Sequence, residues 1–199
     1  MGDFDYAMLT LDRGAAARRA FAERVSAAEL TASGRRAGLF APQLGWEASE
    51  AALLAEQGGG GQALRGLLHA PEVNDCLLHA LRPTIRPTDE SALAPGGIYV
   101  HRWFEVEPSS TAEFIELSAR AWPDFERRFD ARIFGLFELA SEWDGIPPLT
   151  RHLLLITRYG DHAVWEASRD PTTEAMQIFA RRAQLTLSTR AASSLLIAP

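Results

Sequence analysis

The sequence runs twice through the same order of short segments, and this internal repeat limits the folds open to the chain. Three words recur in the same order in the two halves: Gly38-Leu39-Phe40 and Gly135-Leu136-Phe137, Leu53-Leu54 and Leu155-Ile156, and Leu77-Leu78 and Leu195-Leu196. Any one of these words is weak evidence, since Leu and Gly are common. Their shared order along the chain indicates a duplication.

Each half reads as strand, helix, strand, strand, helix, strand. The clearest strands have short β-rich or continuously apolar sequences: residues 6–11, 76–81, 98–106, 131–139, 151–159 and 194–198. This order predicts an α+β fold of two fused ferredoxin-like β-α-β-β-α-β units. Residues 131–139 and 151–159 are apolar on both faces, so each sheet needs helices on one side and another sheet on the other. We therefore expect two antiparallel sheets that form an α/β barrel within one chain.

A segment rich in proline and glycine separates the two halves. Pro83, Pro87, Pro95 and the pair Gly96-Gly97 lie between the last strand of the first half and the first strand of the second. We expect a first unit at residues 1–90, a linker at 91–96 that crosses the surface, and a second unit at 97–199. A homodimer formed through the outer helices stays open.

Three local signals refine the helices of the second half. Ser110 and Glu113 have the spacing of a capping box, and Pro123 should end or kink the helix that follows. Asp170 should be the N-cap of an additional helix. The expected buried face of that helix is Met176, Phe179, Ala180, Ala183 and Leu187.

Composition excludes several classes of function. All 20 cationic residues are Arg, so Schiff-base chemistry and a phosphate-loop lysine are excluded. A net charge of −6 argues against a nucleic-acid partner. The single cysteine, Cys76, forms no intrachain disulfide, and we expect it to be buried and inert. No signal peptide or membrane-spanning stretch is visible, which predicts a cytoplasmic protein without a membrane partner. The bias toward Arg and Ala is typical of a GC-rich bacterial genome.

One segment of the second half carries a family resemblance. Tyr99-Val100-His101-Arg102-Trp103-Phe104-Glu105-Val106-Glu107-Pro108, with Glu113-Phe114 in the following helix, resembles the opening of NIPSNAP proteins in the dimeric α/β-barrel superfamily. Arg102 matches the family's strand arginine, whereas Phe104 replaces its usual tyrosine and Ser109 its glycine. The resemblance implies a fold but no reaction, because the superfamily includes cofactor-independent monooxygenases, haem-binding and haem-degrading proteins, and small isomerases.

The same strand supplies the candidate site. Its side chains alternate between two faces, so either His101 and Trp103 or Arg102 and Phe104 enter the barrel. The resemblance favours the Arg102 face, where an arginine fork could bind an anionic ligand beside aromatic walls. The alternative is an Arg paired with a carboxylate across the sheet. The full set of candidate ligand-binding residues is Arg102, Phe104, His101, Trp103, Trp122, Arg132 and Trp143.

Histidines could serve several roles. For His101, a satisfied structural histidine, a general base and a haem contact all stay open. His162 and Glu166 could share a helix face, but no third ligand is identifiable, so we predict no metal site.

Aromatic residues are unevenly shared between the halves. Four of the five Trp and seven of the ten Phe lie beyond Gly97. This imbalance predicts a ligand cavity in the second half, near Arg102. The alternative explanation is that the second half simply has the larger core.

Three functions therefore remain. The first is binding of a small apolar ligand that can carry a negative charge. The second is a cofactor-independent monooxygenase or isomerase acting on a hydrophobic substrate. The third is a haem-binding or haem-degrading protein. No cofactor is predicted, with haem as the alternative.

Overall fold

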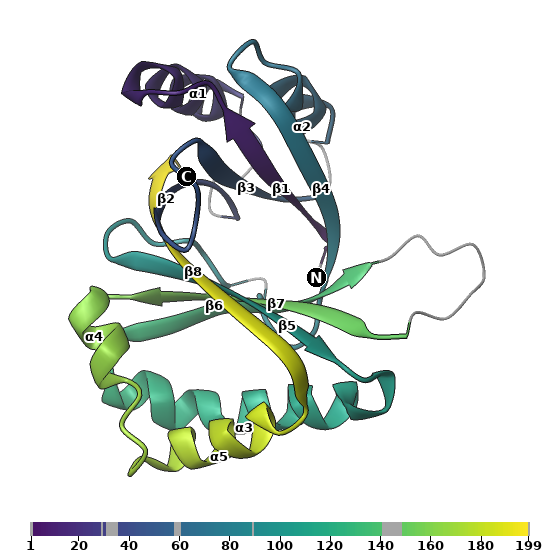
Figure 1. Cartoon of the computed structure of the whole chain (residues 1–199), viewed down its shortest axis with the longest axis vertical. Helices are drawn as coiled ribbons and strands as arrows, with labels where there is room; N and C mark the ends of the chain where they lie inside the picture. Colours follow the sequence, from purple (N-terminus) through teal and green to yellow (C-terminus); the bar gives the residue numbers. More distant parts are fainter. Residues whose placement is uncertain are drawn as a thin grey trace.

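Eight strands close into one barrel, with helices outside both of its sheets (Figure 1). The computed structural model describes residues 2–28, 30, 36–57, 61–88, 90–140 and 149–198. The strands are β1 (Phe4–Leu11), β2 (Ala37–Leu44), β3 (Glu50–Glu56), β4 (Val73–Pro83), β5 (Ile98–Val106), β6 (Ala131–Ala140), β7 (Arg151–Tyr159) and β8 (Thr186–Ala198). The helices are α1 (Ala15–Ala27), α2 (Gly61–Leu68), α3 (Thr111–Arg128), α4 (His162–Ala167) and α5 (Glu174–Ala183), with a 3₁₀ turn at Pro108–Ser110.

The two halves have the same strand order. The first half is arranged β4-β1-β3-β2 and the second β8-β5-β7-β6, which confirms the predicted α+β fold of fused ferredoxin-like units. Each half leaves two edge strands, and the other half pairs with both of them. The seams are β2 with β8 and β4 with β6, all antiparallel. The barrel therefore closes within one chain, as predicted.

Strand register tests the sequence repeat residue by residue. Gly38 pairs with Leu54, and Gly135 pairs with Ile156, so the first two repeated words occupy equivalent positions. Leu54 also pairs with Tyr6, and Ile156 with His101. Tyr6 and His101 are therefore equivalent residues of the two halves.

The third repeated word does not occupy equivalent positions in the two halves. Two residues beyond the equivalent pair, Met8 pairs with Leu77, whereas Trp103 pairs with Arg190. Leu77 therefore corresponds to Arg190 and not to Leu195. The match between the two Leu-Leu words is a coincidence of composition.

Three apolar cores lie in successive layers. One lies between the first sheet and the helices α1 and α2, and another lies between the second sheet and the helices α3, α4 and α5 (Figure 1). The third fills the barrel and takes residues from both halves, including Phe4, Tyr6, Phe40, Phe137 and Leu154. The strands β1, β3, β5 and β7 thus have one face toward the barrel interior and one toward a helix layer.

The connection between the halves contributes to the barrel core. Leu93 is only 6 % exposed and belongs to the central cluster, so the prediction that the linker merely crosses the surface is wrong at this residue. The Tyr99 hydroxyl donates to the carbonyl of Ala94 and accepts from its amide, both at 2.8 Å. These bonds hold the linker across one end of the barrel.

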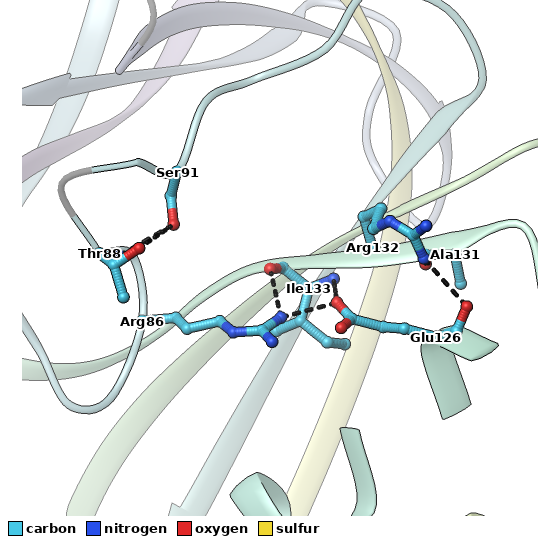
Figure 2. A network of polar contacts seen from close by, with 7 residues as sticks. All are labelled: Arg86, Thr88, Ser91, Glu126, Ala131, Arg132 and Ile133. Atoms are coloured by element: carbon cyan, nitrogen blue, oxygen red, sulfur yellow. Dashed lines mark hydrogen bonds and ion pairs between the residues drawn. The ribbon is translucent and has the colours of Figure 1, made fainter. Parts of the chain in front are cut away.

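A polar network fixes the preceding part of the connection to the second half (Figure 2). Arg86 forms an ion pair with Glu126 at 2.7 Å and donates to the Ile133 carbonyl at 3.3 Å. Glu126 in turn accepts from the Ile133 amide at 2.8 Å. Because Glu126 lies on α3 and Ile133 on β6, the network joins three segments.

The helix signals in the sequence are only partly correct. Ser110 makes no side-chain cap, and Glu113 binds Arg181 instead at 2.6 Å. Helix α3 continues through Pro123, because buried Trp122 and Phe125 on either side hold it against the sheet despite the missing amide. No helix within the described ranges is long and apolar enough to span a membrane.

The thiol of Cys76 is exposed, so the prediction of a buried cysteine is wrong. Cys76 pairs with Leu9 of β1, but among the described pairings β4 meets β6 only from Ala80 to Pro83. The part of β4 that precedes Ala80 therefore has no described pairing with β6, and Leu77 in this part is 57 % exposed.

Gly97 is a position where the fold requires glycine. Its φ is +72°, and an added Cβ would meet the Tyr159 carbonyl. We expect Gly97→Ala to lower the free energy of unfolding by roughly 1–3 kcal/mol, as is usual for such strain. Gly66→Ala is the matched control, since open space surrounds this helical residue and alanine should raise stability by about 1 kcal/mol. Urea titration measures both; equal effects would contradict the assignment.

Candidate functional site

Strand β5 separates two environments. Val100 and Phe104 belong to the core beneath the helices, whereas Tyr99 and Trp103 belong to the barrel core. Arg102 therefore points toward the helices, and the expectation that Arg102 and Phe104 enter the barrel is wrong. The helix layer leaves room for the long guanidinium side chain of Arg102.

A cavity of about 240 Å³ lies between the second sheet and its helices, and Arg102 lines it. Its apolar walls come from β5, β6, β7 and the helix layer: Val100, Phe125, Ile133, Leu155, Trp165 and Phe179. The other lining residues are polar, apart from Met176: Arg102, Thr157, Tyr159, Ser168, Arg169 and Arg182. All of them come from the second half, where the sequence predicts a ligand cavity. Occupation of that cavity stays a prediction.

Arg182 is the most deeply placed cation in this cavity. It is 4 % exposed, and its guanidinium carbon lies 4.5–5.0 Å from the ring centres of Phe104, Phe114 and Phe179. Nη1 donates to the Ser118 hydroxyl at 3.1 Å, whereas Nε is buried without a hydrogen-bond partner. The ring faces stabilise the charge but cannot accept every guanidinium hydrogen.

The cavity is positively charged. None of its lining residues is acidic, and within the described residues neither Arg102 nor Arg182 forms an ion pair. Burial, followed by the charge of Arg102, lowers the pKa of Arg182 to about 9. Burial also lowers the pKa of Arg102, with a further contribution from Arg169. At neutral pH these guanidinium groups nevertheless stay protonated and repel one another.

Tyr159 does not act as a counter-charge. Burial raises the pKa of its hydroxyl, although the positive charge of Arg102 opposes this effect. The phenol is therefore neutral at physiological pH. It offers the cavity a hydrogen-bonding group rather than a negative charge.

Helix α5 positions Arg182. Its N-cap is Thr173, which accepts from the Met176 amide, and not Asp170 as the sequence suggests. Asp124 of α3 accepts from the Ala175 amide at 3.2 Å, which docks the first turn of α5. The expected buried face is only partly correct: Met176 and Phe179 line the cavity, but Ala180 and Ala183 are exposed, and Leu187 lies exposed in β8. Ala175 and Arg182 are buried instead.

Sequence reasoning missed Arg182, although a signal was present. Ala175, Phe179 and Arg182 have the i, i+4, i+7 spacing of one helix face. An arginine on such a face is easily assigned to solvent, because charged residues are seldom fully buried. Arg169 and Tyr159 were missed because nothing in their local sequence distinguishes them.

His101 lies on the opposite side of β5, fully buried in the barrel. Nδ1 lies 2.9 Å from the Tyr6 hydroxyl, and Nε2 lies 2.9 Å from Oγ of Ser194. Ser194 donates to the Tyr99 carbonyl at 3.3 Å, so it can accept from Nε2–H while Nδ1 accepts from Tyr6. Both ring nitrogens have partners, which is the geometry of a structural histidine. Burial lowers its pKa to about 3.

The remaining candidates are dispersed. Trp103 lies in the barrel, where its ring is 5.4 Å from that of Tyr6. Trp122 is buried in the helix-side core beneath the guanidinium of Arg86, outside the cavity lining. Arg132 lies near the surface and donates to the carbonyls of Glu126 and Ala131 (Figure 2). Trp143 lies outside the described residues.

Solved structures with the same fold include proteins of several functions. An anthrone oxidase-like protein is 11 % identical, with a TM-score of 0.63 over 98 % of this chain and 91 % of its own. A ferredoxin-fold protein related to antibiotic biosynthesis monooxygenases, from Listeria monocytogenes, is 12 % identical, with a TM-score of 0.52 over 98 % and 95 %. A haem-binding protein from Thermus thermophilus is 11 % identical, with a TM-score of 0.54 over 98 % and 91 %.

These likenesses define the class of the fold. The chain has an α/β-barrel fold built from two ferredoxin-like units in one polypeptide. No family model matches the sequence, and comparison with curated proteins finds no match. Membership of the NIPSNAP family therefore stays a prediction.

The burial of His101 predicts a specific pH dependence. Its folded pKa of about 3 lies below the value near 6.5 expected when unfolded, so acid favours the unfolded chain. We expect the free energy of unfolding to fall by roughly 2 kcal/mol between about pH 6.5 and pH 4.5 from this group. His101→Gln keeps a donor and an acceptor but cannot titrate, so its pH dependence should be shallower by that amount. Urea titrations at both pH values measure this difference. An equal change in the free energy of unfolding between the two pH values in His101→Gln and in the unchanged protein would reject the prediction.

Proposed function

We propose that this chain binds a small organic anion with an apolar body in the cavity lined by Arg102 and Arg182. The observation that carries the proposal is that the buried guanidinium of Arg182 and the half-buried guanidinium of Arg102 have no carboxylate partner among the described residues. An uncompensated buried charge is costly, and a bound carboxylate or phosphate would neutralise it. Arginine is suited to this because its fork of donors matches a planar anion.

The size of the cavity and the side chains of its walls limit the class of ligand that fits. A cavity of about 150 Å³ is enough to hold benzene, so about 240 Å³ suits a body of one or two rings. Phe125, Trp165 and Phe179 provide aromatic surface for such a body. Thr157 and Ser168 are buried hydroxyl-bearing residues in the same lining, which can orient a polar substituent.

A second candidate is oxidation of a hydrophobic substrate without a cofactor. The names of two fold relatives, an anthrone oxidase-like protein and a relative of antibiotic biosynthesis monooxygenases, favour it. Arg102 and Arg182 could stabilise an enolate or phenolate formed from such a substrate. The described lining contains no histidine or carboxylate that could remove the proton, so we rank binding first. Conversion of anthrone and dioxygen to anthraquinone and water, followed by absorbance, would reverse this order.

Haem fits this cavity poorly. The lining holds no histidine or cysteine, and these side chains most often bind haem iron. Met176 is the remaining soft ligand, and Tyr159 is held neutral by burial. We therefore assign no step to haem; a Soret band after addition of haemin, lost in Met176→Ala, would contradict this.

Arg102→Ala tests the binding proposal with 2-naphthoate as the probe. We expect calorimetry to give a dissociation constant at least roughly tenfold higher than in the unchanged protein, because one charge-assisted hydrogen-bonding group is lost. The thermal midpoint should stay the same or rise, since repulsion between Arg102 and Arg182 is relieved.

Arg132→Ala is the matched control. It removes the same charge from the second half but lies outside the cavity, so binding of 2-naphthoate should not change. A large fall in the thermal midpoint of Arg102→Ala without a binding defect would show that Arg102 is structural. Equal weakening in both variants would show that only net charge matters.

A further inference from the structure

A second cavity opens at the mouth of the barrel, on the opposite side of β5 from the cavity lined by Arg102 and Arg182, which we name the anion cavity. It has a volume of about 280 Å³. Its lining comes from six strands: Met8 of β1, His79 of β4, Trp103, Phe104 and Glu105 of β5, Leu139 of β6, His152 of β7, and Ser188 and Arg190 of β8. We propose that this cavity is a separate binding site for an uncharged aromatic molecule that carries a hydroxyl group. The site is independent of the function proposed above.

Trp103 supplies a fixed aromatic surface. The Tyr6 ring meets it edge-on at 5.4 Å and 74°, and the His79 ring lies at 5.5 Å and 57°. These contacts from β1 and β4 hold the indole in one orientation. Met8 and Leu139 complete an apolar wall around it. A flat, rigid indole beside aliphatic and thioether groups is suited to packing against another ring.

Two imidazoles in this cavity have hydrogen-bonding capacity to spare. Within the described residues, neither the imidazole of His79 nor that of His152 makes a hydrogen bond, in contrast to His101 deeper in the barrel. Burial, and then the charge of His152, lowers the pKa of His79. A neutral imidazole offers one acceptor and one donor, so a ligand hydroxyl can use either nitrogen.

The charged residues at the mouth favour a ligand without net charge. Glu105 and Arg190 carry opposite signs, and each already has a protein partner. Glu105 accepts from the Ser188 hydroxyl at 3.0 Å, and Arg190 donates to the Gly45 carbonyl at 3.1 Å. An anion would be attracted by one and repelled by the other. This balance contrasts with the arginine-rich cavity across the strand.

The volume of the second cavity is consistent with a ligand of one or two rings. The volume of about 280 Å³ exceeds the roughly 150 Å³ sufficient for benzene. Deeper in the barrel the lumen is filled, since Tyr6, Phe40 and His101 are each no more than 1 % exposed. The ligand would therefore rest at the level of Trp103, with its hydroxyl near the two free imidazoles.

A pair of probes separates the two sites: neutral 2-naphthol and anionic 2-naphthoate, each titrated by calorimetry near pH 7. Trp103→Leu should weaken 2-naphthol roughly tenfold and leave 2-naphthoate unchanged. Leu139→Trp should block 2-naphthol by filling the mouth. Arg102→Ala should leave 2-naphthol unchanged, because its side chain faces the other cavity.

Each outcome decides the proposal. Loss of 2-naphthol binding in Trp103→Leu or Leu139→Trp, with Arg102→Ala unaffected, supports it. If 2-naphthol does not bind, or binds equally to both mouth variants and the unchanged protein, the proposal is wrong. Weakening of 2-naphthol by Arg102→Ala alone would place it in the anion cavity and likewise overturn the proposal. Should Trp103→Leu fail to fold, Leu139→Trp decides alone, because Leu139 lies at the rim.

Discussion

The structure depends on the pairing of edge strands between its two halves. A ferredoxin-like sheet ends in two strands with unused backbone hydrogen-bonding groups, and each half here satisfies both edges of the other. Closure places one face of every strand in a shared interior. Tyr6 of the first half and His101 of the second meet there at 2.9 Å, and Ser194 extends the contact to β8. Closure of the barrel thus brings Tyr6 and His101 of different halves into contact at its centre.

The two halves differ at the position that lines the arginine-rich cavity in the second half. Equivalence of Tyr6 and His101 makes Ala7 the counterpart of Arg102. Ala7 is completely buried in a core that includes Phe21, Leu64 and Leu67. A small side chain there allows close packing of α1 and α2. In the second half, a long arginine on the strand and a second one on α5 keep the layers apart around a positively charged space.

Sequence patterns predicted the architecture well, because strand composition and repeat order report on the whole sheet. The bounds of β5 and β7 agree with the predicted strands, and the strand order follows from the split βαβ unit. The candidate site was harder to predict. Alternation along β5 left two faces open, and only tertiary packing assigns Arg102 to the helix side. Arg182 was missed because an arginine on an otherwise apolar helix face is easily assigned to solvent.

Strand β5 is paired along its length on both sides, with β7 and with β8. Such a strand has little freedom to move toward either cavity, so it acts as a rigid partition between a compartment with excess positive charge and one in which the charges of Glu105 and Arg190 balance. Adjacent codons, those for Arg102 and Trp103, then specify side chains in different compartments. Substitution at one position can change the chemistry of its own compartment without altering the other, so natural variation could modify the two independently along a single strand.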